Sequence, residues 1–177
     1  MKLIIGLGNP GSEYEKTRHN AGFILVDVLQ SNHEFSTFTL DKKFNAQTSE
    51  GFIDTEKYIL VKPQTFMNRS GESVRAIIDF YKIDPEDITV AADDLDIEIG
   101  NYKITRDSRA AGHNGIQNII DNIGTQDFTR IKLGVEVSGG RKERGEISGH
   151  NFVLQNFSSD ELTTLDTAIK NALTNLQ

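Results

Sequence analysis

The residues of this sequence that could do chemistry stand where apolar segments meet polar loops. His19 lies in the stretch 17–23, at the change from a polar loop to an apolar, helix-like segment, and Asp93 directly follows the apolar run 88–92. A histidine in such a place can be held by backbone and still face solvent, as a proton-transfer group must. Further polar side chains at similar transitions are Asn9, Asn68, His113 and Asn114.

One histidine, one aspartate and several asparagines suit hydrolysis without a covalent intermediate. Asp93 can accept the imidazole N–H of His19 and hold the tautomer whose other nitrogen takes a proton from water. Asparagine amides donate and accept hydrogen bonds while staying neutral, so they can orient a water or a carbonyl and stabilise an oxyanion. The structural alternatives stay open at this point, since Asp93 can cap a turn and the asparagines can stabilise loops.

Other chemistries have less support in the sequence. No G-x-S-x-G elbow is present for a serine nucleophile, and the absence of cysteine excludes thiolate chemistry and cysteine zinc sites. The four histidines are far apart without metal-ligand spacing, and the acidic run 93–96 is only a loose cation site, so we expect no metal. The stretch 6–11 formally matches G-x-G-x-x-G, but a polar segment follows it instead of a helix. We therefore expect no dinucleotide site.

Length and composition indicate an ordinary globular protein. The 177 residues favour one domain over 1–177, with 37% hydrophobic and 25% charged residues. No apolar run is long enough for a membrane span, and the lack of cysteine is compatible with a reducing cytoplasm. A net charge of −7 argues mildly against a nucleic-acid partner. Residues 103–144, however, hold eight basic and five acidic residues, a flank that could meet phosphates.

Apolar patterns along the chain predict strands that alternate with helices. Strands are expected at 2–7, 58–61, 88–92, 97–104 and 130–137, with short strands within 35–53, and helices at 21–32, from Gly71 to before Asp84, and from Ile116. Ser158 and Glu161 fit a capping box for a last helix whose apolar face is Leu162, Leu165, Ile169, Leu173 and Leu176. The glycine-rich, charged segment 138–149 is expected to be a mobile loop. This alternation predicts a single α/β domain with a largely parallel sheet.

Five stretches together resemble the bacterial peptidyl-tRNA hydrolase family in order and spacing. Any one of them alone is unspecific, whereas five in register are highly specific. The resemblance covers the chain from Met1 to about Gly134. The stretches are Gly6-Leu7-Gly8-Asn9-Pro10-Gly11, Thr17-Arg18-His19-Asn20-Ala21-Gly22-Phe23, Lys62-Pro63-Gln64-Thr65-Phe66-Met67-Asn68-Arg69-Ser70-Gly71, Asp93-Asp94-Leu95-Asp96 and Gly112-His113-Asn114-Gly115.

The resemblance implies a monomeric α/β protein with a twisted, mostly parallel mixed sheet flanked by helices. It implies hydrolysis of the ester between a peptide and the terminal ribose of tRNA, without metal or cofactor. His19 would be the general base, kept able to accept a proton by Asp93, and Asn9 would help to distinguish N-blocked from free aminoacyl groups. Asn68 and Asn114 would hold the peptide end and water. Tyr14 and Phe66 would contact the acceptor end of tRNA, and His113 would lie in the substrate crevice.

The sequence departs from the family pattern mainly in the basic flank. Thr105 replaces a residue that is commonly basic, Lys132 replaces a usual arginine, and Glu136 stands where glycine is common. The loop 107–111 has less glycine than usual, and the C-terminus is shorter. These changes leave His19 and Asp93 intact but predict a weaker or differently oriented grip on tRNA phosphates. Two other functions stay open: a non-catalytic RNA-binding relative, and a hydrolase of small N-acyl esters that has given up tRNA.

Overall fold

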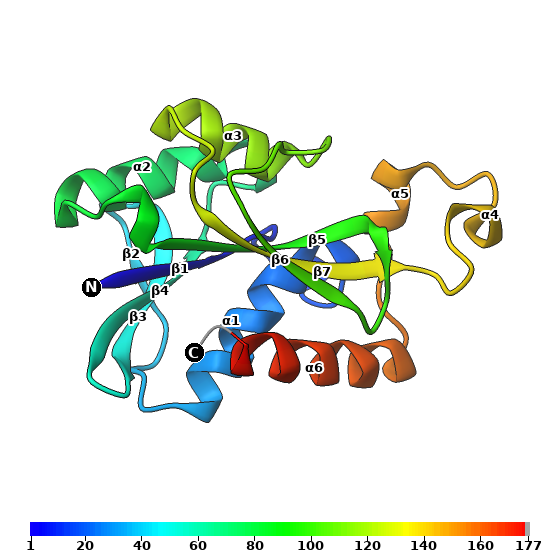
Figure 1. Ribbon diagram of the computed structural model, residues 1–177, viewed down its shortest axis with the longest axis horizontal. Coiled ribbons are helices and arrows are strands. Elements are labelled where there is room, and N and C mark those ends of the chain that lie inside the picture. The colour runs from blue at the N-terminus through cyan, green and yellow to red at the C-terminus, as the bar shows by residue number, and fades with distance from the viewer. Residues whose placement is uncertain (176–177) are drawn as a thin grey trace.

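A seven-stranded mixed sheet forms the centre of the computed structural model, which describes residues 1–175 (Figure 1). The order across the sheet is β2-β3-β4-β1-β5-β7-β6. The four central strands β4, β1, β5 and β7 are parallel, and the β2–β3, β3–β4 and β6–β7 pairs are antiparallel. The strands are β1 (Lys2–Gly6), β2 (Thr39–Asp41), β3 (Ala46–Ile53), β4 (Glu56–Pro63), β5 (Ile88–Glu98), β6 (Tyr102–Arg106) and β7 (Thr129–Glu136). The predicted α/β class with a parallel centre is confirmed.

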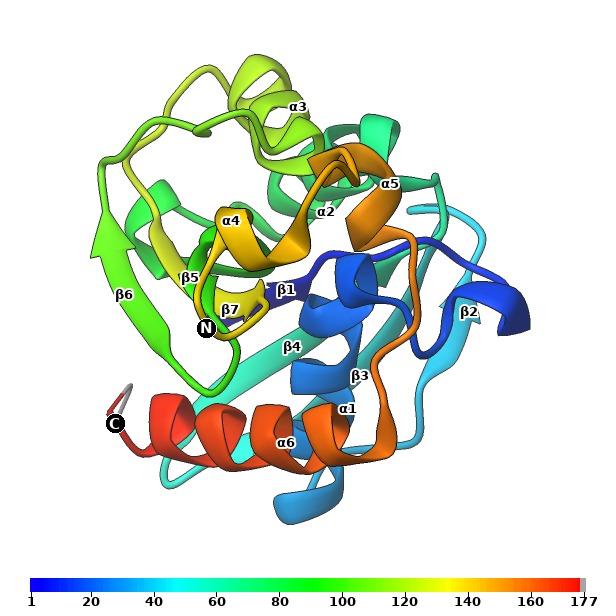
Figure 2. The same cartoon turned by 90° about the vertical axis from the view of Figure 1, so that its right-hand side faces the viewer.

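Helices cover both faces of the sheet. Figure 1 shows α2 and α3 on one face, α1 and α6 on the other, and α4 and α5 at one end of the molecule, the end that faces the viewer in Figure 2. The α-helices are α1 (Ala21–Asn32), α2 (Ser70–Tyr81), α3 (Asn114–Ile123), α4 (Arg141–Arg144), α5 (Gly149–Val153) and α6 (Ser159–Thr174). Short 3-10 turns are η1 (Ser12–Tyr14), η2 (Arg18–Asn20), η3 (Met67–Arg69) and η4 (Pro85–Asp87). Among the described helices, none is both long and apolar enough to cross a membrane.

The two cores follow from the alternation of side chains along the central strands. In β1, Leu3 and Ile5 point into the core beneath α2 and α3, whereas Ile4 points into the core beneath α1 and α6. Because both faces are covered, β1 has three successive apolar residues from Leu3 to Ile5 and no polar alternation, as is typical of a central parallel strand.

The predicted helix at 21–32 coincides with α1, and the capping box that opens α6 is present. Ser158 Oγ accepts from the backbone N–H of Glu161, and a carboxylate oxygen of Glu161 accepts from the backbone N–H of Ser158. Leu165, Ile169 and Leu173 are buried, as the apolar face of α6 requires, and Leu162 is partly buried against the same core. Leu176, assigned to the same face, lies outside the described residues.

The expected end of the strand at 88–92 and the expected strand at 97–104 are both wrong. Strand β5 does not stop at Ala92 but continues through the acidic run to Glu98, because Asp93 and Asp94 pair with Leu133 and Gly134 of β7. A register shift follows between Asp94 and Glu98. The strand expected at 97–104 is therefore divided: its start belongs to β5, and the rest begins β6 at Tyr102, antiparallel to β7.

Segment 138–149 is more structured than the expected mobile loop. It contains α4, and the side chain of Arg144 is only 7% exposed beside the equally buried Glu136, with 3.5 Å between their charged atoms. The guanidinium of Arg144 also lies 5.4 Å from the ring centre of Phe152 in α5. An ion pair and an aromatic contact therefore hold this glycine-rich segment against the end of the sheet.

Candidate active site

A close approach of α1 to the sheet brings His19 to the middle of β5, where Asp93 lies. The backbone N–H of Leu7 donates to Ala91 O at 2.9 Å, and that of Phe23 donates to Leu7 O at 3.2 Å. Between them, Gly22 lies so close that a Cβ atom there would collide with the carbonyl oxygen of Ala91 and the backbone of Leu7. The glycine thus allows the turn η2, which precedes α1, to face the strand that carries Asp93.

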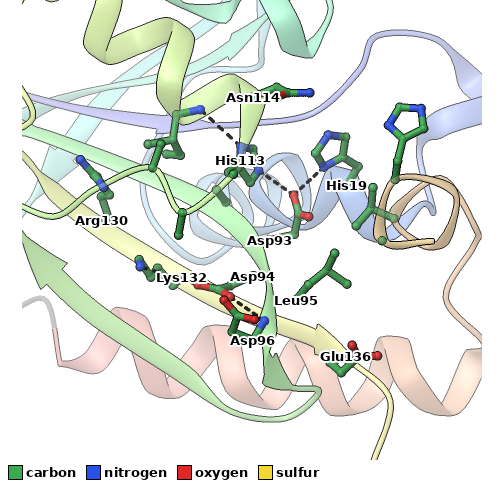
Figure 3. Close-up of a pocket in the computed structure, with 18 of the residues that line it drawn as sticks. His19, Asp93, Asp94, Leu95, Asp96, His113, Asn114, Arg130, Lys132 and Glu136 are labelled. Atoms are coloured by element: carbon green, nitrogen blue, oxygen red, sulfur yellow. Dashed lines mark hydrogen bonds and ion pairs between the residues drawn. The ribbon is translucent and has the colours of Figure 1, made fainter. Parts of the chain in front are cut away.

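His19, Asp93 and His113 meet through one oxygen atom (Figure 3). Asp93 Oδ1 lies 2.8 Å from Nδ1 of His19 and 3.0 Å from Nε2 of His113. The side chain of Asp93 is 3% exposed, while those of His19 and His113 are 15% and 12% exposed. A buried carboxylate therefore joins two histidines that both reach the surface of a cavity.

The hydrogen bonds assign the tautomers of both neutral rings. His113 is the N-cap of α3, and its Nδ1 accepts from the backbone N–H of Ile116 at 3.3 Å, so the proton of a neutral His113 is on Nε2. His113 then donates to Asp93. His19 likewise donates from Nδ1 to Asp93, so its Nε2 is unprotonated when the ring is neutral. No group among the described residues is bonded to that nitrogen.

The shared carboxylate also sets the charge balance of the site. Burial alone would raise the pKa of Asp93, but the charges and N–H groups of His19 and His113 outweigh it and hold that pKa well below its usual range. Burial would lower the pKa of His19, but the charge of Asp93 and the hydrogen bond to it outweigh burial and raise it. Asp93 is therefore ionised, and His19 binds a proton more readily than a free imidazole.

A cavity of about 440 Å³ opens over this cluster. His19, Asp93, His113 and Asn114 line one part of it. The other part is lined by charged side chains of both signs, from β5, β7, α4 and the loop before α3: Asp94, Asp96, Arg109, Arg130, Lys132, Glu136, Arg141 and Arg144. Asn114 is exposed at the first turn of α3, beside His113.

Asn9 lines a second cavity of about 470 Å³, which is also lined by Asn20, the residue after His19. Its side-chain oxygen accepts from the backbone N–H of Met67 at 2.8 Å. The side chain of Asn20 bonds both the N–H and the C=O of Asn9, at 2.8 and 3.0 Å. Asn9 thereby ties the loop after β1 to the turn that follows β4.

Tyr14, Phe66 and Asn68 line neither of these two cavities. The rings of Tyr14 and Phe66 meet edge to face, with centres 6.4 Å apart, and Phe66 is 54% exposed at a positive φ of 61°. Asn68 is exposed in η3, directly after the Met67 that binds Asn9. The structure therefore groups these three residues on the surface beside the site and not within the cavity over Asp93.

His19, Asp93 and His113 are also close enough together to coordinate a metal ion. One ligand atom each from His19, Asp93 and His113 lies within 4.8 Å of the others. The facing nitrogens are, however, the two that carry protons toward Asp93, and a ligating nitrogen must be unprotonated. The hydrogen-bond pattern thus fits a carboxylate that accepts a hydrogen bond from each histidine better than it fits a metal site.

Sequence reasoning assigned no role to the two neighbours of His19. Asn20 is 1% exposed and carries the two bonds to Asn9, and Arg18 is 6% exposed and reaches the start of α6. Their position beside His19, in a polar stretch that then becomes helical, is the only sequence feature that points to them. Their partners lie 11 and 143 residues away.

Comparison with known proteins identifies the family of the chain. A family model described as peptidyl-tRNA hydrolase matches residues 3–177. The chain belongs to the peptidyl-tRNA hydrolase family. It is 46% identical over 170 residues to peptidyl-tRNA hydrolase of Listeria monocytogenes, covering 96% of this chain and 87% of that one. It is 43% identical over 172 residues to that of Bacillus cereus, covering 97% and 89%.

A solved member of the family has the same fold. The crystal structure of peptidyl-tRNA hydrolase from Acinetobacter baumannii superimposes with a TM-score of 0.88 at 38% identity, covering 99% of this chain and 86% of that one.

Of the positions expected to depart from the family pattern, Lys132 and Glu136 line the charged part of the cavity and Thr105 does not. Lys132 of β7 lies 3.7 Å from Asp94, which offsets part of its charge, and Thr105 Oγ1 is bonded to Ser108 Oγ at 3.1 Å. Lys103 of β6 is the cross-strand neighbour of Lys132. Two lysines on adjacent strands therefore remain available to phosphate, one of them with an acidic partner.

Proposed function

We propose that this protein hydrolyses the ester bond between a peptide, or an N-blocked aminoacyl group, and the terminal ribose of tRNA, with His19 as general base. The observation that carries the proposal is the bond from His19 Nδ1 to the ionised Asp93, which leaves Nε2 as a proton acceptor at a cavity. Membership of the family supports the substrate class.

The proposed reaction uses water as the nucleophile. His19 Nε2 takes a proton from water while the water oxygen attacks the ester carbonyl carbon, which forms a tetrahedral oxyanion. Asp93 stabilises the resulting imidazolium. The bond from carbon to the ribose oxygen then breaks, and His19 returns the proton to that oxygen. Free peptide acid and tRNA leave.

The remaining residues are proposed to bind substrate. Asn114 lies in the cavity with an amide that can hold the peptide or the attacking water, and Asn68 would do the same from η3. The exposed edge-to-face pair of Tyr14 and Phe66 offers aromatic faces to the bases of the acceptor end. Asn9, which is bonded through its oxygen to Met67, would present its amide N–H₂ to the N-blocked end.

The direct test is release of tRNA from an N-acetylated aminoacyl-tRNA with EDTA present. We expect turnover that EDTA does not reduce, because each step above uses only side chains of this chain and water. An aminoacyl-tRNA with a free amino group is the matched control and should turn over much more slowly. Turnover that EDTA abolishes and zinc restores would favour the metal arrangement of His19, Asp93 and His113 instead.

The same assay separates the two alternatives. A non-catalytic RNA-binding relative would bind tRNA and release nothing. A hydrolase of small N-acyl esters would cleave such esters without inhibition by bulk tRNA, and its rate would not fall with salt. An enzyme that contacts phosphates loses affinity as salt rises, and with few contacts on the 103–144 flank we expect a shallow slope.

The raised pKa of His19 predicts the pH dependence. The reactive form is the neutral ring, and its share grows as pH rises through a pKa above the ordinary 6.5. We therefore expect kcat/KM to increase with pH through a midpoint above that value and then level off. The check is a pH series corrected for uncatalysed ester hydrolysis. A rate that falls over the same range would mean that the protonated ring is the active form.

A further inference from the structure

Arg18, the residue before His19, is buried and points away from the cavity. Its Nη2 donates to both carboxylate oxygens of Glu161 at 2.9 Å, and its Nη1 donates to Asn156 O at 2.8 Å. The guanidinium carbon lies 4.2 Å from the ring centre of Phe152. A fully charged side chain buried in this way needs such partners, and all of them lie on the segment from α5 to α6.

Backbone bonds join the same two segments. The N–H of Arg18 donates to Gln155 O at 3.0 Å, and the N–H of Phe157 donates to Lys16 O at 2.9 Å, with an isolated antiparallel bridge between Thr17 and Asn156. The loop that carries His19 is therefore attached to residues 155–157 by both main chain and side chain.

Glu161 connects this attachment to the core. It is the third residue of α6, where its carboxylate completes the capping box with Ser158 while it also binds Arg18. Helix α6 is seated on the sheet through Leu165 and Ile169. The carboxylate of Glu161 thus caps the N-terminus of α6 and also binds Arg18, the residue before the proposed base.

The turn η2 is too short to fix the position of His19 by its own hydrogen bonds, so contacts with other segments must do so. It is a single 3-10 turn of three residues, and no side chain caps it. Besides the backbone bonds to residues 155–157 and the packing of Gly22 on the sheet, its described anchors are the side chains of Arg18 and Asn20 and the bond of His19 to Asp93. A shift of the turn would lengthen that bond, and proton transfer is sensitive to displacements of about 1 Å.

We propose that Arg18 and Glu161 are positioning residues, which hold η2 so that His19 stays bonded through Nδ1 to Asp93. This inference rests on the proposed function for its effect on rate. Neither residue touches the cavity over Asp93, so the pair acts through the placement of His19 alone.

The decisive variant is Glu161→Gln. Glutamine can still complete a capping box but has no charge for Arg18. We expect kcat to fall about tenfold or more with little change in KM, as a small misplacement of a catalytic group does. Ring 1H–15N spectra of His19 should at the same time show loss of the single Nδ1–H tautomer. Ser158→Ala is the matched control: it removes the cap hydroxyl, leaves Glu161 on Arg18, and should keep the parent kcat and spectrum.

Two further variants test the same inference if Glu161→Gln folds poorly. Glu161→Asp should have a higher kcat than Glu161→Gln, because it keeps the negative charge. Arg18→Lys should have a lower kcat than the parent, because an ammonium group cannot bind Glu161 and the Asn156 carbonyl together. The double variant Arg18→Lys/Glu161→Gln should be no slower than the slower single one. Parent-like kcat and His19 spectra in Glu161→Gln, or an equal loss in Ser158→Ala, would overturn the inference. If the parent releases no tRNA while the spectra still separate the variants, the positioning stands and the proposed function falls.

Discussion

His19→Ala is expected to lower kcat for N-acetylaminoacyl-tRNA by about 10³-fold, within the range that a general base contributes. The substitution removes the proposed proton acceptor, while the residues proposed to bind substrate are unchanged: Asn68, Asn114, Tyr14 and Phe66. KM should therefore change little. The measurement is steady-state release of tRNA with EDTA present, and the circular dichroism spectrum of the variant should match that of the parent.

His33→Ala is the control for this substitution. His33 follows α1 and lies edge-on to Phe35, with ring centres 6.5 Å apart, and it lines neither cavity near His19. It should keep the parent rate. Added imidazole can enter the space left in His19→Ala and is expected to restore a part of kcat. A His19→Ala protein that retains most of its rate would place the base elsewhere.

Asp93→Asn is expected to lower kcat by about 10²-fold, less than the roughly 10⁴-fold loss that accompanies an inverted tautomer. Both histidines donate to the single oxygen Oδ1, so an amide oxygen in the same place can accept from both and preserve the geometry. What is lost is the negative charge that stabilises the imidazolium. The pH midpoint of kcat/KM should fall, because that charge is what raises the pKa of His19.

Asp54→Asn is the matched control, since Asp54 is exposed in the turn between β3 and β4 and lines neither cavity near His19. It should change neither kcat nor the pH midpoint. Asp93→Ala, which offers no acceptor to either histidine, should be slower than Asp93→Asn. If Asp93→Asn lost as much as Asp93→Ala, its amide N–H₂ would be facing His19, and the tautomer and not the charge would be the main contribution of Asp93.

The local elements could be predicted because their causes are local. Helix α1 follows from apolar spacing after a polar stretch, and the capping box of α6 follows from Ser158 and Glu161 three residues apart. The acidic run was expected to end a strand, since Asp and Asn are uncommon in strands. Pairing with β7 overrode that local preference and extended β5 to Glu98.

By itself, the sequence determined the fold class and the order of most strands and helices, and it singled out a histidine, an aspartate and asparagines as candidates, although it wrongly placed Asp93 at the end of a strand. Only the tertiary structure decided that His113 and His19 share one oxygen of Asp93, because those contacts span 20 and 74 residues. The tertiary structure also decided that Arg144 forms an ion pair with Glu136 and that Arg18 binds Glu161, 143 residues away in the sequence. Apolar periodicity can be read from residues close together in the sequence, whereas the partner of a buried charge depends on which distant segments the folded sheet brings together.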